Sequence, residues 1–433
     1  MGRRVVRATI AVVAVIAAAA APLEAATPAG PDLEQLAQVP IEMNNGTSFT
    51  TGSRRAAGSD LAFQGDLLVA GAWEGIGFFR ILERAPYLKQ LSFFDCPGAQ
   101  ADVSVWGDYV FVSIEHQSSY GLTPNIGVNG TCNQSGVGFG MEGIRIIDIS
   151  DPREPRQVKF IPIVCGSHTH TLIPDGDKLY LYNSALAPPY AGDHVPYCAR
   201  ITIIEMPAGD PTQAEIVAEP RMNLREGCHD ITAFPEEGMA LGACWQHSWL
   251  WDITKPAAPK IISKLPSDWA EGHHAAAFTW DGNYLAVGQE AGNCRTEEGE
   301  IAFYDIRDRK RPKKVGRFHL PRKVVGSFCW AHNFSVVPTK DRSRYVLTAG
   351  FYNGGTTVVD FSNPRNPKEI GFAAEAQGRT LPEPWGAYWY NGRIYSNDWT
   401  SGFGVTVYEM EGLGSGDGVH FKPRLNPQLQ IRP

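Results

Sequence analysis

A short motif recurs along this chain at nearly regular intervals. It joins an aspartate-led turn to two prolines, and its copies DISDPREP, DITKPAAP, DIRDRKRP and DFSNPRNP begin at Asp148, Asp252, Asp305 and Asp360. These starts are 104, 53 and 55 residues apart, and a weaker copy, ITIIEMPAGDP (201–211), lies in the doubled interval. Self-similarity with a period of roughly 50 residues indicates a repeat fold.

Each copy of the motif follows an apolar run typical of a β-strand, such as GIRIIDIS or TTVVDFS. The aspartate can accept hydrogen bonds from the turning backbone, and the second proline suits only an edge strand. Half a repeat earlier lies a hairpin pattern, for example LIPDGDKLYLY or FTWDGNYLAVG. Each repeat therefore predicts four strands, and four-stranded units in series indicate the blades of a β-propeller.

We predict an all-β fold over residues 59–412, a seven-bladed β-propeller of four-stranded blades. The predicted blades cover residues 59–97, 98–164, 165–225, 226–270, 271–327, 328–382 and 383–412. The last blade lacks an obvious outer strand. The N-terminal segment 27–58, or the otherwise irregular tail 413–433, is therefore expected to complete the ring.

The N-terminus has the three parts of a secretory signal peptide, predicted over residues 1–26. Arg3, Arg4 and Arg7 precede the apolar run ATIAVVAVIAAAAA, which ends near the small residues Ala25 and Ala26. A membrane anchor is the alternative, but no second long apolar run follows, so no membrane span is expected after signal removal. The predicted location is secreted, either periplasmic or extracellular. The net charge of −7 offers no basic surface for nucleic acid, so no nucleic-acid partner is expected.

All eight cysteines lie in the part expected to be exported, which favours disulfide bonds. One member of each expected pair begins or precedes a first strand, and the other lies at or beyond the end of a second strand. Sequential pairing is therefore predicted, as Cys96–Cys132, Cys165–Cys198, Cys228–Cys244 and Cys294–Cys329. Pairing between blades, such as Cys132–Cys198, is the main alternative.

The recurring unit, a strand followed by DIS-P-x-x-P, resembles the LVIVD repeat, which occurs in exported bacterial and archaeal proteins. The resemblance covers roughly residues 59–410 and implies a seven-bladed propeller. It implies no particular activity, because propellers support enzymes, receptors and scaffolds alike.

Histidines cluster where the first strands of four consecutive blades are expected to begin. These starts read SHTHTLIP, CHDITAFP, HHAAAFTW and AHNFSVVP, and they supply His168, His170, His229, His273, His274 and His332. First strands surround the central channel of a propeller and start at one mouth, so the imidazoles are expected to meet there. His168 and His170 are expected on one strand face, because residues i and i+2 point to the same side. Imidazole is a common ligand of Cu, Fe and Zn, so the sequence predicts a site for one of these transition-metal ions.

Two carboxylates are candidates for catalysis at the same mouth. Glu115 and Glu290 follow expected second strands, whose ends should lie beside the histidines, and either could transfer protons. The alternative is structural, with each histidine hydrogen-bonded to a neighbouring blade. Trp330 and Trp385 are expected near the mouth, where they could line an apolar substrate pocket.

Two functions remain open from the sequence. The first is a metal-binding propeller that supports metal-dependent oxidoreductase or lyase chemistry on an unidentified small molecule. The second is a non-enzymatic module at the cell surface that binds a protein or glycan. The long segment 117–140 would suit the second function.

Overall fold

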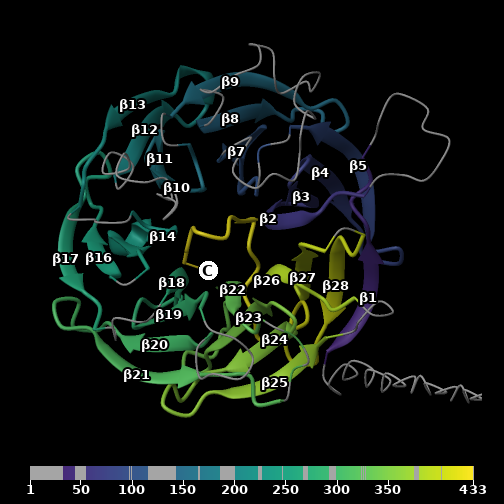
Figure 1. The fold of residues 1–433 in the computed structure, drawn as a ribbon, viewed down its shortest axis with the longest axis vertical. Helices are drawn as coiled ribbons and strands as arrows, with labels where there is room; N and C mark the ends of the chain where they lie inside the picture. The colour runs from purple at the N-terminus through teal and green to yellow at the C-terminus, as the bar shows by residue number, and fades with distance from the viewer. Residues whose placement is uncertain are drawn as a thin grey trace, which may run out of the picture.

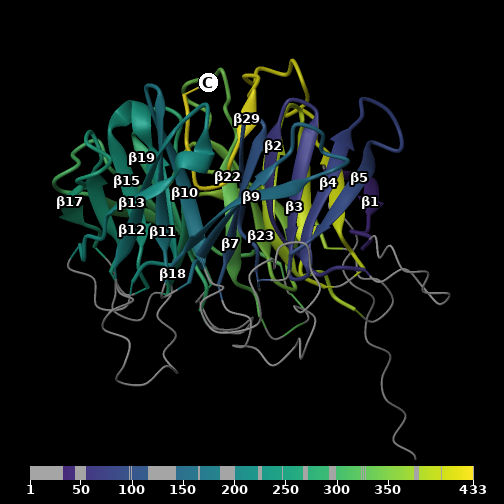
Figure 2. The same cartoon turned by 90° about the horizontal axis from the view of Figure 1, so that it is seen from above.

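Mostly antiparallel sheets surround a central axis, and in each four-stranded unit the consecutive strands proceed from the axis outward (Figure 1). The computed structural model describes residues 33–43, 55–96, 98, 100–115, 143–163, 166–185, 200–222, 227–245, 247–266, 272–291, 299–322, 324, 326, 328–374, 380–400 and 402–432. In the perpendicular view the strands run between two faces, and the C-terminus lies at one of them (Figure 2).

Five sheets are separate blades. The first holds β2 (Gly58–Gln64), β3 (Leu67–Ala72), β4 (Gly75–Ile81) and β5 (Leu88–Asp95), with β29 (Arg424–Leu425) added to β2. The second holds β6 (Val103–Trp106), β7 (Tyr109–Ile114), β8 (Gly143–Asp148) and β9 (Arg156–Pro162). The third holds β10 (Thr169–Asp175), β11 (Lys178–Ser184), β12 (Ile201–Pro207) and β13 (Glu215–Ala218), and the short 3-10 helix η2 (Pro211–Gln213) precedes β13.

The fourth blade holds β14 (Asp230–Phe234), β15 (Met239–Ala243), β16 (Trp249–Asp252) and β17 (Lys260–Lys264), with the 3-10 helix η3 (Pro235–Glu237) between β14 and β15. The fifth holds β18 (His273–Phe278), β19 (Tyr284–Gln289), β20 (Ile301–Asp305) and β21 (Lys313–Phe318). The sixth sheet is eight-stranded. It contains β1 (Glu34–Val39), β22 (Ala331–Val336), β23 (Val346–Phe351), β24 (Gly355–Asp360), β25 (Lys368–Ala373), β26 (Pro384–Tyr390), β27 (Arg393–Asp398) and β28 (Val405–Glu409).

The all-β prediction is confirmed, but the prediction of seven separate four-stranded blades is wrong. The described strands form five separate blades and one eight-stranded sheet. That sheet occupies the region expected to hold two blades, residues 328–382 and 383–412. It is continuous because the innermost strands β22 and β26 pair in parallel, through Asn333 with Gly386 and Phe334 with Ala387. The repeat pattern predicts strands but cannot reveal hydrogen bonds between neighbouring innermost strands.

The recurring aspartate forms the turn that the sequence predicted. Asp148, Asp252, Asp305 and Asp360 end β8, β16, β20 and β24, and in each the carboxylate accepts a hydrogen bond from the backbone N–H two residues later, at 2.9–3.1 Å. This turn redirects the chain into the outermost strand of the sheet.

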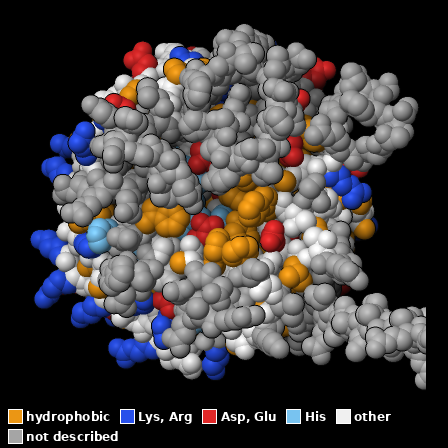
Figure 3. All heavy atoms as spheres, viewed as in Figure 1, with side chains coloured by type: hydrophobic (Ala, Val, Ile, Leu, Met, Phe, Trp, Pro, Cys, Tyr) orange, Lys and Arg blue, Asp and Glu red, His pale blue; other side chains and the backbone are white. Residues whose placement is uncertain are grey.

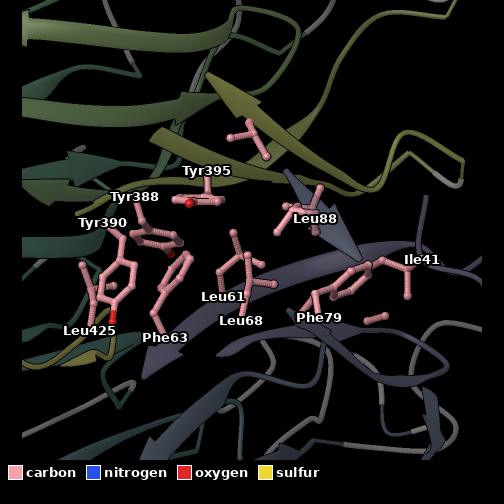
Figure 4. Packing of buried hydrophobic residues seen from close by; sticks show 14 of the residues in the cluster. Ile41, Leu61, Phe63, Leu68, Phe79, Leu88, Tyr388, Tyr390, Tyr395 and Leu425 are labelled. Atoms are coloured by element: carbon pink, nitrogen blue, oxygen red, sulfur yellow. The ribbon is translucent and has the colours of Figure 1, made fainter. Parts of the chain in front are cut away.

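Both ends of the described chain pair with distant strands. β1 pairs with β28, and β29 pairs with β2, so the N-terminal segment and the tail join elements from opposite ends of the sequence. Figure 4 shows the apolar cluster at this junction, where Ile41, Phe63, Tyr390 and Leu425 pack together with residues of β2, β3 and β27. The division of the chain at residues 26, 58 and 412 stays a prediction.

The C-terminal tail crosses the axis beyond β29 (Figure 1). The Asn426 amide accepts a hydrogen bond from the Val105 N–H at 2.8 Å and donates one to the Val105 carbonyl at 3.0 Å. Ala233 donates its N–H to the Gln428 carbonyl and accepts from the Gln430 N–H. The tail therefore connects three blades, those that contain β2, β6 and β14.

One predicted disulfide is confirmed, between Cys228 and Cys244. Cys228 lies just before β14 and Cys244 just after β15, so the bond links adjacent antiparallel strands. Cys96 and Cys329 are also disulfide-bonded. The other predicted pairings involve cysteines 132, 165, 198 and 294, which lie outside the described residues, as does the predicted signal peptide. Within the described ranges, no helix has the length and apolar character that crossing a bilayer requires.

The tail's contribution to stability can be tested with Asn426→Ala. This variant leaves the buried Val105 N–H and carbonyl without their side-chain partner, so we expect the free energy of unfolding to fall by about 1–3 kcal/mol. Urea denaturation measures the change. Asn366→Ala, at an exposed position of the DFSNPRNP turn, is the matched control and should change stability by less than about 0.5 kcal/mol. If the two variants were equally stable, the contact between Asn426 and the Val105 backbone would not stabilise the fold.

Candidate metal centre

Four histidines lie side by side at the axis, and we call them the four-histidine cluster. His168 and His229 immediately precede β10 and β14, whereas His274 and His332 are the second residues of β18 and β22. Consecutive ring centroids are 4.1, 3.6 and 4.1 Å apart along the series His168, His229, His274, His332. None is more than 4% exposed. Four consecutive sheets therefore place one imidazole each in a common buried group.

Hydrogen bonds orient three of these rings through Nδ1. Nδ1 of His168 lies 2.8 Å from a Glu115 carboxyl oxygen, and Nδ1 of His229 lies 3.0 Å from one of Asp230. His332 donates its Nδ1–H to the Trp385 carbonyl at 2.6 Å. Because a carbonyl oxygen only accepts, Nδ1 of His332 carries a proton, and the lone pair of the neutral ring is left on Nε2.

The Nε2 atoms of two of the rings face each other. Nε2 of His168 and Nε2 of His229 are only 2.5 Å apart. Two lone pairs cannot face each other at that distance, so a proton or a cation must lie between them. His274 is fully buried, and neither of its ring nitrogens makes a hydrogen bond in the described structure. An unsatisfied buried polar group costs about 1–3 kcal/mol, which makes His274 the most unusual member of the cluster.

Glu290 follows β19 and lies beside two of the histidines. Its carboxylate oxygens are 3.4 Å from Nε2 of His274 and 3.8 Å from Nε2 of His332. Burial raises the pKa of Glu290 to about 8, so the side chain holds a proton at neutral pH in the metal-free protein. Burial likewise raises the pKa of Asp230 to about 8.

The histidines differ in their protonation. Burial, followed by repulsion from neighbouring histidines, lowers the pKa values of His274 and His229 well below the ordinary 6.5. Burial also lowers the pKa of His332 well below 6.5. Burial alone would lower the pKa of His168, but Glu115, with smaller contributions from Asp230 and Glu290, leaves that pKa above its ordinary value. Most of the cluster is therefore neutral at physiological pH, as metal ligands must be.

Two overlapping sets of side chains have the spacing of metal ligands. His229, Asp230 and His274 form one, and His274, Glu290 and His332 form the other, with ligand atoms within 4.8 Å of one another. His274 is common to both sets.

Two of the histidines singled out from the sequence lie apart from this cluster. His170 is held by Ser104 at 2.6 Å on Nε2 and by Ser113 at 2.8 Å on Nδ1. Nδ1 of His273 lies 2.6 Å from the Ser248 hydroxyl. His168 precedes the first residue of β10, so strand alternation does not place it on the same face as His170. Both His170 and His273 have the hydrogen bonds of structural residues.

Four of the six histidines predicted from the sequence, and both glutamates, lie at this site. The prediction did not include two groups that form hydrogen bonds to these histidines. Asp230 follows His229 directly, in a His-Asp pair that could have suggested a carboxylate–imidazole contact. The Trp385 carbonyl is a backbone group, and no side-chain pattern could have indicated it.

Comparisons with known proteins identify the repeat and the fold. Residues 348–373, which run from within β23 to the end of β25, match the LVIVD repeat, and this match confirms the resemblance seen in the sequence. A crystal structure of a protein from Lactobacillus plantarum is similar to this chain with a TM-score of 0.55 and 10% identity, over 86% of this chain and 97% of that one. A functionally unknown protein from Desulfotomaculum acetoxidans DSM 771 gives a TM-score of 0.46 and 13% identity, over 73% and 85% of the two chains. No curated protein matches the sequence.

The structural assignment of His170 predicts a specific phenotype. His170→Ala removes the ring that bonds to the Ser104 hydroxyl and takes one of two partners from the Ser113 hydroxyl, which also accepts from Ser167. The free energy of unfolding should therefore fall by about 1–3 kcal/mol. His420→Ala, at a partly exposed position of the tail, is the control and should change stability little. Denaturant titration of both variants provides the measurement. A His170→Ala variant as stable as the wild type would contradict the assignment.

Proposed function

We propose that this chain is an exported propeller whose four-histidine cluster binds one transition-metal ion, Cu, Fe or Zn, through His168, His229, His274 and His332. The proposal includes metal-dependent oxidoreductase or lyase chemistry at this centre. Its strongest support is His274, a fully buried imidazole with both nitrogens unsatisfied among the described residues.

The surrounding residues fit such an ion. Histidine ligands of protein metal sites usually donate their second N–H to a carboxylate or a backbone carbonyl, which orients the ring. Three of the four rings have such a partner at Nδ1. These partners are Glu115 for His168, Asp230 for His229 and the Trp385 carbonyl for His332. An all-imidazole donor set suits Cu, Fe or Zn and is less suited to Ca²⁺ or Mg²⁺, which prefer oxygen.

The carboxylates have different roles in this proposal. A bound ion of this kind supplies Lewis acidity and, for Cu or Fe, electron transfer. Glu290 is the proton carrier, because its carboxyl group faces the Nε2 side of His274 and His332. Glu115 holds the ring of His168 from the opposite side, so in this account it orients a ligand and does not move protons.

Export is part of the same proposal. The confirmed disulfide between Cys228 and Cys244 is compatible with an oxidising compartment such as the periplasm or the extracellular space. The signal-like residues 1–26 support the same location.

Metal analysis of purified variants tests the centre. Wild-type protein incubated separately with Cu(II), Zn(II) and Fe(II) and then desalted should retain about one equivalent of at least one metal, measured by elemental analysis. His274→Ala should retain less than about a tenth of that amount, because it removes the ligand common to both candidate sets. His420→Ala is the matched control and should bind metal like the wild type.

Thermal melting separates a metal centre from structural histidines. At a free metal concentration 100 times Kd, binding should stabilise the wild type by about 2.7 kcal/mol and should not stabilise His274→Ala. If the cluster is structural, as in a non-enzymatic module that binds a protein or glycan, a proton lies between His168 and His229. The wild type then stays metal-free and its melting temperature does not respond to any of the ions. That result would contradict the proposal.

A further inference from the structure

Aromatic side chains form a continuous surface beside His332, and we call it the aromatic wall. Its members come from the segment before β22, the end of β23, the start of β26 and the end of β27, and they are Phe328, Trp330, Tyr352, Trp385 and Trp399. Successive ring centroids along this series are 4.7, 6.2, 6.3 and 6.0 Å apart, and Tyr352 also lies 5.7 Å from Trp399.

The inner end of the wall touches the four-histidine cluster. The His332 ring centroid is 4.3 Å from that of Trp385 and 4.8 Å from that of Tyr352. Trp385 also accepts the Nδ1–H of His332 on its carbonyl. Both aromatic residues are buried. A molecule that contacts the wall at this end would therefore lie next to a proposed metal ligand.

The outer end of the wall is open to solvent. Phe328 is 44% exposed and Trp399 is 37% exposed, which places both among the most exposed large hydrophobic residues of the described chain. Figure 3 shows hydrophobic side chains gathered beside acidic and histidine side chains at the centre of this face. The wall thus extends from the protein surface to the buried cluster.

The groups around the wall favour an uncharged ligand. The cation–π contacts found in the described structure all involve aromatic rings outside the wall. Three carboxyl groups lie near Tyr352, those of Glu290, Glu383 and Asp398, and they disfavour an anionic ligand.

We infer that the aromatic wall binds an uncharged, planar aromatic or conjugated organic molecule and directs one end of it toward His332. This inference rests on the proposed metal centre for its functional meaning, because it names the class of substrate that would reach the metal. Flat ligands gain from stacking and edge-to-face contacts with indole and phenyl rings, worth about 0.5–1.5 kcal/mol per pair beyond simple burial. A saturated ligand of similar size lacks that gain.

Three probes of similar size test the chemistry of the ligand. They are 2-naphthol, which is planar and uncharged at pH 7, its saturated analogue decahydro-2-naphthol, and the anion 2-naphthalenesulfonate. Titration calorimetry on full-length, metal-loaded protein should give clear binding of 2-naphthol and at least about threefold weaker binding of each of the other two.

Two variants at the exposed end of the wall test its location. Trp399→Ala and Phe328→Ala should each weaken 2-naphthol binding by about three- to tenfold, as expected for the loss of one aromatic pair. Their metal content should remain that of the wild type, because neither residue touches the four-histidine cluster. Phe421→Ala, at a tail position that is 69% exposed, is the matched control for losing an exposed aromatic ring and should leave the affinity within twofold of wild type.

The outcomes separate this inference from the proposed function. If 2-naphthol fails to bind wild-type protein of normal metal content, or binds Trp399→Ala and Phe328→Ala as tightly as the wild type, the inference is wrong and the metal centre stands. Equal binding of the saturated analogue would likewise overturn it, since the surface would then be only apolar. If the protein retains no metal after incubation with the three ions and yet binds 2-naphthol through Trp399 and Phe328, the wall stands and the metal centre is wrong.

Discussion

The contact of four buried imidazole rings at the axis constrains the surrounding structure. A buried histidine needs a hydrogen-bond partner for each ring nitrogen, because burying an unpaired polar group costs about 1–3 kcal/mol. Here the Nδ1 atoms of three rings are bonded to Glu115, Asp230 and the Trp385 carbonyl, and Nε2 of His168 faces Nε2 of His229. Three separate blades and the eight-stranded sheet must therefore hold their positions together.

The tail at the other end of the axis is connected to this arrangement through buried carboxylates. The Gln428 amide donates to Asp60 at 3.4 Å and to Asp102 at 3.3 Å, and Asp102 accepts the backbone N–H of His170 at 2.7 Å. Burial, then repulsion from Asp102, raises the pKa of Asp60 well above its ordinary value. Buried polar groups thus extend from the tail to the residues beside the four-histidine cluster. The aromatic wall is the apolar part of the surroundings of that cluster.

The sequence predicted those features that depend on local pattern. The period of the aspartate–proline motif predicted the strands and their turns, because each copy forms its own hydrogen bonds within a few residues. The parallel pairing of β22 with β26, which reduced the number of separate blades, depends on two strands about 50 residues apart and leaves no local signal. For the same reason, the sequence grouped His170 and His273 with the other histidines, although serines of neighbouring blades bind their rings. Alternation within a strand could not place His168, which lies outside β10.

The account's central claim is that the Nε2 atoms of the four-histidine cluster share one metal ion. X-ray absorption spectroscopy at the edge of the metal retained by the wild type examines those atoms directly. The account predicts a first shell of three or four nitrogen ligands at about 2.0–2.1 Å for Zn, with the multiple-scattering pattern of imidazole. A first shell of oxygen or sulfur without imidazole scattering would show that the retained metal lies elsewhere and would contradict the account.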